Sequence, residues 1–370
     1  MKMLIHAQTI PGAVRPIRIS EPEIYADHEK AGRSGHLGHG LAEFAPGKII
    51  DFNPNTSAKR LSGHAAFGWV EYRISEDYGK TFSAPKILPY SWETLLDGVQ
   101  TISVEKAVSA PDGSITAFCL RNSQRDPVCC EPWDTPTYVR SEDGGETWSK
   151  PVELCPYKGR VYDAVSRDGV IYVLHFCNDA EEFFCGSKPE HVYRLYKSFD
   201  NGKTFQEACV VPFPSTVGRG YGNMVFTTEG ELLVYAYNVN DQEHMDVMRS
   251  RDSGKTWCEY TRSYCARKIR NPQVALLDDQ YILHGRAGEN EAGSGAFVIY
   301  TSRDGIHWDA GTILVDGRPA CFYSNNLVIT CPDGKKRMLV QYSENYNDPQ
   351  PGVWTAQVND MHLWIESEAE

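Results

Sequence analysis

A short pattern, Ser-x-Asp-x-Gly-x-Thr followed by Trp or Phe, recurs five times in this chain of 370 residues and constrains its fold more than any other feature. In each copy the Asp can bind backbone amides, the Gly can take a positive φ, and the aromatic ring can pack beneath the turn. The copies are Ser75–Phe82, Ser141–Trp148, Ser198–Phe205, Ser250–Trp257 and the one-residue-shorter Ser302–Trp308. Their period matches one four-stranded blade, so the sequence predicts an all-β fold, a β-propeller.

A second repeat lies between these copies and sets the number of blades. Six segments each show an apolar run, a turn and a second apolar run, which is the pattern of a β-hairpin. They span residues 41–50, 108–115, 165–171, 225–232, 274–282 and 327–338. We therefore expect six blades of four antiparallel strands, with a strand near Ile17–Ser20 closing the ring. Because no linker interrupts the pattern, we expect one domain over residues 1–370.

Composition narrows the class of partner. The chain has no apolar stretch long enough to span a bilayer, and Met1–Gln8 lacks the apolar core of a signal peptide, so we expect no membrane partner and a cytoplasmic protein. The 11 cysteines show no zinc spacing and indicate reduced thiols, with no metal or cofactor. A net charge of −12 argues against nucleic acid but permits a small anionic substrate in a locally basic pocket.

Polar and ionisable residues gather where the inner strands are expected to begin. In a propeller these strand ends surround the axis and line a pocket. The residues at these starts are His36, His39, Glu105, Asp163, Arg219, Tyr221, Asn223, Arg270, Asn271, Tyr323, Ser324 and Asn325. The loops after the second strands add His64, Arg121, His175, Tyr237, Arg286 and Glu344. A packed core would not use so many polar residues at equivalent positions, so the pattern predicts one pocket.

The five repeats resemble the Asp boxes, or BNR repeats, of the sialidase (neuraminidase) superfamily. The last hairpin carries a second resemblance: Ala320–Leu327 followed by Gln341–Glu344 is similar to the segment that holds the nucleophilic tyrosine of that family. The resemblance implies that Tyr323 attacks the anomeric carbon and that Glu344 takes or shares its proton. It also places Arg286 as the third arginine of a carboxylate-binding triad. A phenol suits an acidic sugar, but it needs an adjacent base because its ordinary pKa is about 10.

Other parts of the chain depart from the family pattern. The stretch Gly38–Phe44 contains no arginine where the family has its first triad arginine, and Ser62–Ala66 contains no aspartate where the family has its general acid. We therefore expect a different acid, either His64 or Glu105. The rebuilt clamp would use Arg219, Arg270 and Arg286, with His39, Tyr221 and Asn325 also contacting the substrate.

Three functions remain open at this point. The first is an exo-glycosidase that removes a terminal sialic-acid-like or other acidic sugar from small glycosides; within it, Glu105 and Asp163 could instead act as paired carboxylates. The second is a lyase that removes the proton α to a uronate carboxylate, with Arg286 neutralising the acid and Tyr323 or a histidine moving protons. The third is a non-catalytic carbohydrate-binding propeller, in which these same residues only pack or form salt bridges.

Overall fold

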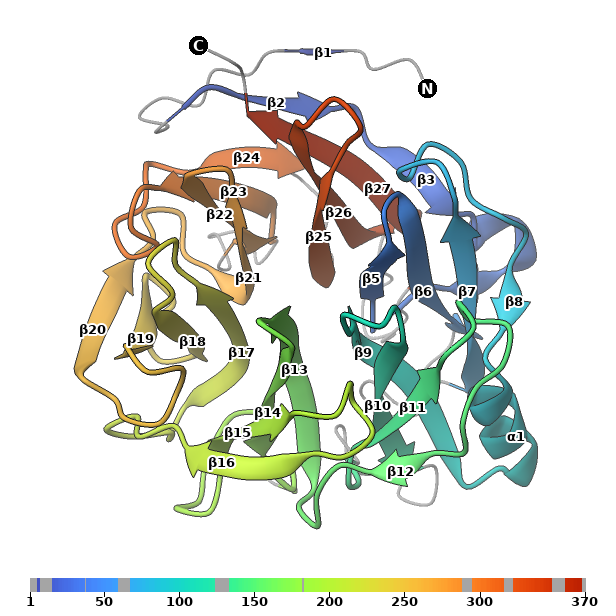
Figure 1. Ribbon diagram of the computed structural model, residues 1–370, viewed down its shortest axis with the longest axis horizontal. Helices are drawn as coiled ribbons and strands as arrows, with labels where there is room; N and C mark the ends of the chain where they lie inside the picture. Colours follow the sequence, from blue (N-terminus) through green and yellow to red (C-terminus); the bar gives the residue numbers. More distant parts are fainter. Residues whose placement is uncertain are drawn as a thin grey trace.

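The molecule is a ring of six β-sheets around a central axis (Figure 1). The computed structural model describes residues 5–6, 15–36, 38–58, 67–123, 133–181, 183–287, 295–315, 322–347 and 357–367. Each sheet is antiparallel and built on four strands, so the predicted six-bladed β-propeller is confirmed. Across the described part of the chain, no helix is both long enough and apolar enough to cross a bilayer.

In every blade the first strand lies nearest the axis and the later strands follow toward the rim (Figure 1). Blade one contains β5 (Gly40–Ala45), β6 (Lys48–Ser57), β7 (Gly68–Ser75) and β8 (Lys86–Ile87), with β4 (Arg33–Ser34) paired to β6. Blade two contains β9 (Gln100–Ser109), β10 (Ile115–Ser123), β11 (Thr137–Ser141) and β12 (Val152–Glu153). Blade three contains β13 (Gly159–Arg167), β14 (Val170–Cys177), β15 (Val192–Ser198) and β16 (Gln206–Val210).

The remaining blades repeat this order. Blade four contains β17 (Arg219–Phe226), β18 (Leu232–Asn238), β19 (His244–Ser250) and β20 (Glu259–Tyr264). Blade five contains β21 (Arg270–Leu277), β22 (Gln280–Arg286), β23 (Phe297–Ser302) and β24 (Thr312–Val315). Blade six contains β25 (Ser324–Thr330), β26 (Lys336–Asn345), β27 (Val358–Ser367) and β2 (Ile17–Ser20), joined by β1 (Ile5–His6) and β3 (Glu23–Ala26). The described residues also form two short helices, η1 (Glu29–Ala31) and α1 (Pro89–Asp97).

The ring is closed by the strand that the sequence predicts. Strand β2 pairs antiparallel with β27, with Ile17 opposite Ser367 and Ile19 opposite Ile365. Ile17 and Ile365 are buried in the core that blades five and six share. Because β2 comes from the start of the chain and β27 from its end, their pairing holds the first and last parts of the sequence in one blade.

Apolar layers between neighbouring blades hold the ring together. One cluster joins blades three and four, and others join the remaining adjacent pairs. Strands inside a blade therefore pack on both faces, which explains the unbroken apolar run Leu232–Ala236 in β18. The inner strands contact one another around the axis in the order β5, β9, β13, β17, β21 and β25.

The five repeats form the turns between the third and fourth strands of blades one to five. In blade two, the hydroxyl of Ser141 donates to Asp143 and accepts from the Gly145 amide, both at 2.8 Å, and Asp143 accepts from the amide of Thr147 at 2.9 Å. Gly145 has φ +90°, where a side chain would be strained. The same contacts recur in the other four copies. These turns lie at the end of each blade opposite to the start of its inner strand.

We expect these turns to make folding stability depend on pH between about pH 4 and pH 2. Hydrogen bonds from Thr147 lower the pKa of Asp143 to about 2, and those from Thr256 do the same for Asp252. A carboxyl whose pKa is depressed in the folded protein stabilises it above the unfolded value of about 3.9, and this contribution is lost as pH falls through the folded pKa. The thermal midpoint of Asp143→Asn/Asp252→Asn, followed by circular dichroism, should fall less steeply from pH 4 to pH 2.5 than that of the unmodified protein. Equal slopes would contradict the assignment.

Candidate functional site

A small cavity lies on the axis, at the end of the ring where the inner strands begin. Its volume is about 50 Å³, enough for a few water molecules or a carboxylate-sized group. All six blades contribute to its wall, through Gly38, His39, Glu105, Lys106, Arg160, Tyr162, Tyr221, Gly222, Asn271, Gln273, Tyr323 and Ser324. Among the described residues, no group of three His, Cys, Asp or Glu side chains is arranged to hold a metal ion.

β-Bulges turn the cavity-lining residues toward the axis. In β9, β13, β17 and β21 the pairing with the second strand shifts by one residue. The extra residue is Glu105 in β9, Tyr162 in β13 and Tyr221 in β17, and in β21 the shift falls at Asn271-Pro272. Glu105, Tyr162, Tyr221 and Asn271 all line the cavity. A bulge redirects a side chain out of the regular pleat, and bulges are common next to active sites.

The backbone around the cavity is strained. Tyr221 and Phe322 have φ values of +34° and +37°, a region that bulky side chains rarely adopt. Both side-chain polar atoms of Asn271 are buried without a hydrogen-bond partner among the described residues. Such strain and unsatisfied polarity persist only where the surrounding structure enforces them, and they concentrate at sites of function.

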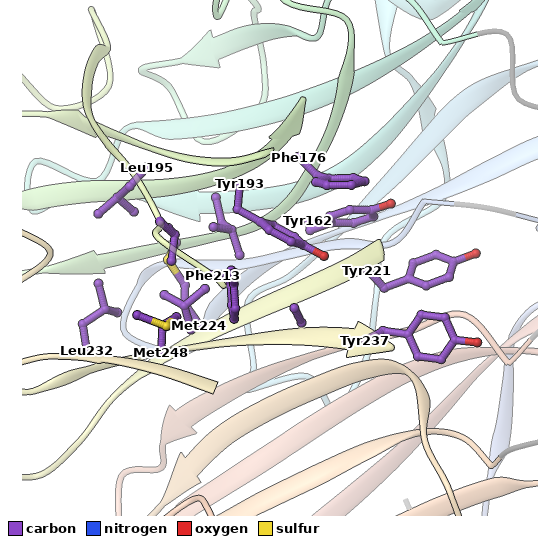
Figure 2. Packing of buried hydrophobic residues seen from close by; sticks show 14 of the residues in the cluster. Tyr162, Phe176, Tyr193, Leu195, Phe213, Tyr221, Met224, Leu232, Tyr237 and Met248 are labelled. Carbon is purple, nitrogen blue, oxygen red and sulfur yellow. The ribbon is translucent and has the colours of Figure 1, made fainter. Parts of the chain in front are cut away.

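Tyr323 of blade six meets Tyr221 of blade four in this cavity. Its hydroxyl lies 3.3 Å from that of Tyr221, and its ring packs edge-on against His36 with the centroids 5.3 Å apart. The guanidinium of Arg270 lies over Phe184, Tyr221 and Tyr237, at 4.9, 5.9 and 5.9 Å from the ring centroids. Figure 2 shows Tyr221 and Tyr237 side by side with their hydroxyls pointing the same way.

Arg270 carries its charge without a carboxylate partner in the described part of the chain, where no salt bridge involves it. Burial on its own lowers the pKa of a guanidinium, but the nearby hydroxyls of Tyr221, Tyr323 and Tyr237 raise the pKa of Arg270 above its ordinary value. Arg270 is therefore a cation held by the aromatic rings of Phe184, Tyr221 and Tyr237.

Arg160, which lines the cavity, is neutralised by Glu105. Its Nε and Nη2 atoms donate to one carboxylate oxygen of Glu105, at 2.9 and 2.6 Å, and both side chains are 5% exposed. The guanidinium also lies 5.3 Å from the ring centroid of Tyr162 and 5.8 Å from that of Tyr221. The predicted catalytic residue Glu105 thus reaches the cavity, but as the partner of Arg160.

A polar plug closes the axis beneath the cavity. Lys106 donates to Gln273 at 2.6 Å and to Asn325, and it forms an ion pair with Asp163 at 3.1 Å. Asp163 also accepts from the side chain of Asn223, at 2.7 Å. A second cavity of about 560 Å³, lined mainly by apolar residues of the inner strands, opens at the other end of the axis. The structure therefore places Asp163 and Asn325 in the plug and not in the wall of the axial cavity.

The three arginines of the expected clamp do not all meet. Arg270 and Arg286 lie directly opposite each other on β21 and β22. Burial raises the pKa of Tyr237, and the charges of both arginines oppose this rise, so both lie near Tyr237. Arg219 instead forms an ion pair with the buried Asp246 and donates to the carbonyl of Val217 at 2.9 Å. Its role in binding stays a prediction that this geometry does not support.

Glu344 contacts Tyr342 and not Tyr323, the partner that the family resemblance implies. Its carboxylate accepts from the hydroxyl of Tyr342 at 3.1 Å. Alternate residues of a strand share a face, and Tyr342 packs against Phe297 in the core between blades five and six. The hydroxyl found next to that of Tyr323 belongs to Tyr221. His64 lies outside the described residues.

Arg160, Tyr162 and Lys106 line the cavity but were missed by the sequence analysis, whereas Asn271 was among the residues expected there. One weak signal could have found Arg160 and Tyr162, because Gly159-Arg160 starts an inner strand at the same level as the other expected residues. Nothing in the sequence indicates that Lys106, within an apolar strand, has a buried anionic partner.

Comparison with known proteins shows which structures share this fold, but it does not identify an activity for this chain. Neither a protein-family model nor a curated protein sequence matches the chain. A protein of unknown function from Dyadobacter fermentans shares 16% identity over 95% of this chain and 99% of its own, with a TM-score of 0.71. The Hadza microbial sialidase shares 15% identity over 93% of this chain and 68% of its own, with a TM-score of 0.64.

A Trypanosoma rangeli sialidase, in complex with 2,3-difluorosialic acid as a covalent intermediate, shares 14% identity. The match covers 89% of this chain and 53% of the trypanosomal one, with a TM-score of 0.58. At such identities the likeness establishes a shared propeller fold, which hosts many activities.

Proposed function

We propose that the protein is a sialidase-like exo-glycosidase that removes a terminal acidic sugar from small glycosides, with Tyr323 as the nucleophile. The observation that carries the proposal is the pairing of the Tyr323 and Tyr221 hydroxyls at 3.3 Å in the axial cavity. The guanidinium of Arg270 lies 5.9 Å from the centroid of the Tyr221 ring. The propeller fold is also found in sialidases, and this analogy supports the proposal.

The charge distribution fits an acidic sugar. Glu105 neutralises Arg160 and Asp163 neutralises Lys106, whereas Arg270 has no carboxylate partner among the described residues. A guanidinium binds a carboxylate well because its planar fork matches the two oxygens. The cavity holds a group of carboxylate size, so the acidic group of the sugar would enter it while the ring lies further out.

The reaction would proceed through the phenol of Tyr323. Its oxygen attacks the anomeric carbon while the bond to the leaving alcohol breaks. Arg270 favours the developing phenolate, and the Tyr221 hydroxyl can donate a hydrogen bond to it. Glu344 is not assigned the proton of Tyr323, because its carboxylate binds Tyr342.

A uronate lyase is the second candidate, and His39 is the observation that favours it. This histidine lines the cavity and is 3% exposed, and burial lowers its pKa. It is therefore uncharged at neutral pH and can accept a proton α to a carboxylate whose charge Arg270 would offset.

A panel of aryl glycosides tests the proposal. We expect aryl release from acidic sugars but not from their neutral counterparts, with oxygen from heavy-oxygen water in the sugar product. Arg270→Met should raise KM for the acidic substrate by roughly one to two powers of ten, because a charge-assisted contact is lost. The control is Arg15→Met, which removes an exposed arginine paired with Asp279. An unsaturated product would favour the lyase, and sugar binding without turnover would favour a binding protein.

A further inference from the structure

A buried cluster of histidines and aspartates lies between blades one and six, behind the axial cavity. The Nε2 atom of His28 lies 2.8 Å from Asp360 Oδ2, and His39 Nδ1 lies 3.7 Å from Asp360 Oδ1. Next to them, His362 Nε2 lies 2.7 Å from Asp51. Both carboxylates are 0% exposed. Burying such charges is costly, so a cluster of this kind calls for an explanation.

One member of the cluster reaches the cavity with its polar atoms unsatisfied. Neither ring nitrogen of His39 has a hydrogen-bond partner among the described residues, and neither does Asp360 Oδ1. Buried polar groups are nearly always hydrogen-bonded. The 3.7 Å gap between His39 Nδ1 and Asp360 Oδ1 is too long for a hydrogen bond, but catalytic hydrogen bonds often tighten only when a ligand is bound. The second ring nitrogen, Nε2, is left for a group in the cavity.

Asp360 is held in place from several sides. His28 binds its other oxygen, and the backbone amide of His28 donates to the side chain of Asn359 at 2.7 Å. A Cβ atom on Gly35 would lie 2.3 Å from Asp360 Oδ2, so only glycine fits there. The carboxylate therefore has a fixed orientation toward His39.

The same strand level connects Asp360 to Tyr323. Asp360 on β27 lies opposite Ser343 on β26. The amide of Ser343 donates to the carbonyl of Tyr323 at 3.0 Å, and the Ser343 hydroxyl accepts from the Tyr323 amide at 3.2 Å. His39 and Tyr323 both line the axial cavity, so the group that Asp360 orients and the phenol face the same space.

We propose that His39 is the proton acceptor of the axial cavity and that Asp360 is its positioning residue. The inference rests on the proposed function. As the Tyr323 oxygen bonds to the anomeric carbon, its proton passes to His39 Nε2, and the leaving alcohol takes a proton from water. When water later attacks the anomeric carbon and releases the sugar, the proton of that water neutralises the hydroxide left by the first step, and the phenol oxygen regains its own proton from His39. Asp360 accepts from Nδ1–H, which fixes the tautomer with its lone pair on Nε2.

The charges around His39 set the direction of its pH dependence. Burial lowers the pKa of His39, the carboxylate of Asp360 raises it, and His28 and His362 lower it further. Glu105, Lys106 and Arg160 face it across the cavity. Because the unprotonated form is the active one, kcat/KM should rise with pH through the pKa of His39. Loss of the Asp360 charge should move this rise to lower pH.

Kinetics of His39→Gln and Asp360→Asn test the assignment, with His307→Gln as the matched control. His307 also pairs with an aspartate, at 2.7 Å from Asp304, but its side chain is 86% exposed in a turn at the opposite end of the blades. We expect His39→Gln to lower kcat/KM by roughly two to four powers of ten and to remove the acid limb of the pH profile. Asp360→Asn should lower kcat and shift the limb to lower pH with KM unchanged, and His307→Gln should change neither.

Two further measurements distinguish a failure of the His39 assignment from a failure of the proposed function. Imidazole added to His39→Ala should restore part of the activity, which a structural role for the ring would not allow. In the protein with 15N-labelled histidine, the His39 titration, identified by its loss in His39→Gln, should move to lower pH in Asp360→Asn. An active wild type with His39→Gln within threefold of it, or an unmoved titration, would overturn the inference.

Discussion

Tyr323→Phe should lose roughly three to six powers of ten in kcat on an acidic aryl glycoside while it still binds the sugar. Removal of a covalent nucleophile has effects of this size, because no other group in the site replaces it in forming the covalent intermediate. The phenylalanine ring keeps the edge-on contact with His36, and Arg270 keeps its charge, so binding should survive. Stopped-assay kinetics and calorimetric binding of the sugar measure the two effects separately.

Tyr342→Phe is the control for this prediction. It removes a tyrosine hydroxyl in the same blade, the one that donates to Glu344 at 3.1 Å, and should leave kcat within a few-fold. Glu344→Gln tests the role that the family resemblance implies for Glu344. If Glu344→Gln were as inactive as Tyr323→Phe, the carboxylate would act on the reaction despite its contact with Tyr342. If Tyr323→Phe kept a tenth of the activity, Tyr323 could not be the nucleophile.

The propeller could be predicted because its determinants are local. The hydrogen bonds that stabilise each turn lie within one repeat of eight residues, as in Ser141–Trp148. Five copies of the repeat therefore indicate five blades, whatever the rest of the sequence contains. The closing strand was predictable for a similar reason: Ile17–Ser20 is a short strand-like segment left over after the hairpins are counted. That it pairs with β27 follows from the ring, which cannot close without an outer strand.

The position of the cavity was predictable from the sequence, but the side chains that enter it and the contacts that they make were not. The starts of the inner strands do line one cavity, yet the four bulges decide which side chains enter it. A bulge changes register by one residue and so reverses which face a side chain takes, and sequence alternation alone does not show it. Asp163 shows the result: Tyr162, the bulged residue, lines the cavity, and Asp163 joins Lys106 in the plug.

The pairing of charges depends on contacts far apart in the sequence. Arg160 with Glu105 and Lys106 with Asp163 each join two blades, and His39 with Asp360 joins the first blade to the last. No spacing rule reports such pairs from a single chain. The ion pair of Arg219 with Asp246 is another contact that the sequence does not indicate, because Asp246 lies on the third strand of the same blade.

The plug should be the most sensitive point of the fold. The side chains of Lys106 and Asp163 are 8% and 5% exposed, and their contacts with Gln273, Asn325 and Asn223 connect five of the six inner strands. Replacing buried ion pairs by apolar groups can be nearly neutral, but removal of one partner leaves the other charge buried without compensation. The stability of the ring therefore depends on keeping both charges or neither.

Lys106→Met should accordingly lower the free energy of unfolding by about 3–5 kcal/mol, measured by urea denaturation. In Lys106→Met/Asp163→Asn neither charge remains, so the double variant should be more stable than Lys106→Met, and the double-mutant cycle should show strong coupling. The control, Lys48→Met, breaks an exposed pair whose side chains are 46% and 72% exposed, and should cost less than about 1 kcal/mol. If Lys106→Met cost no more than Lys48→Met, the plug would not hold the inner strands, and the axial cavity above it would need another floor.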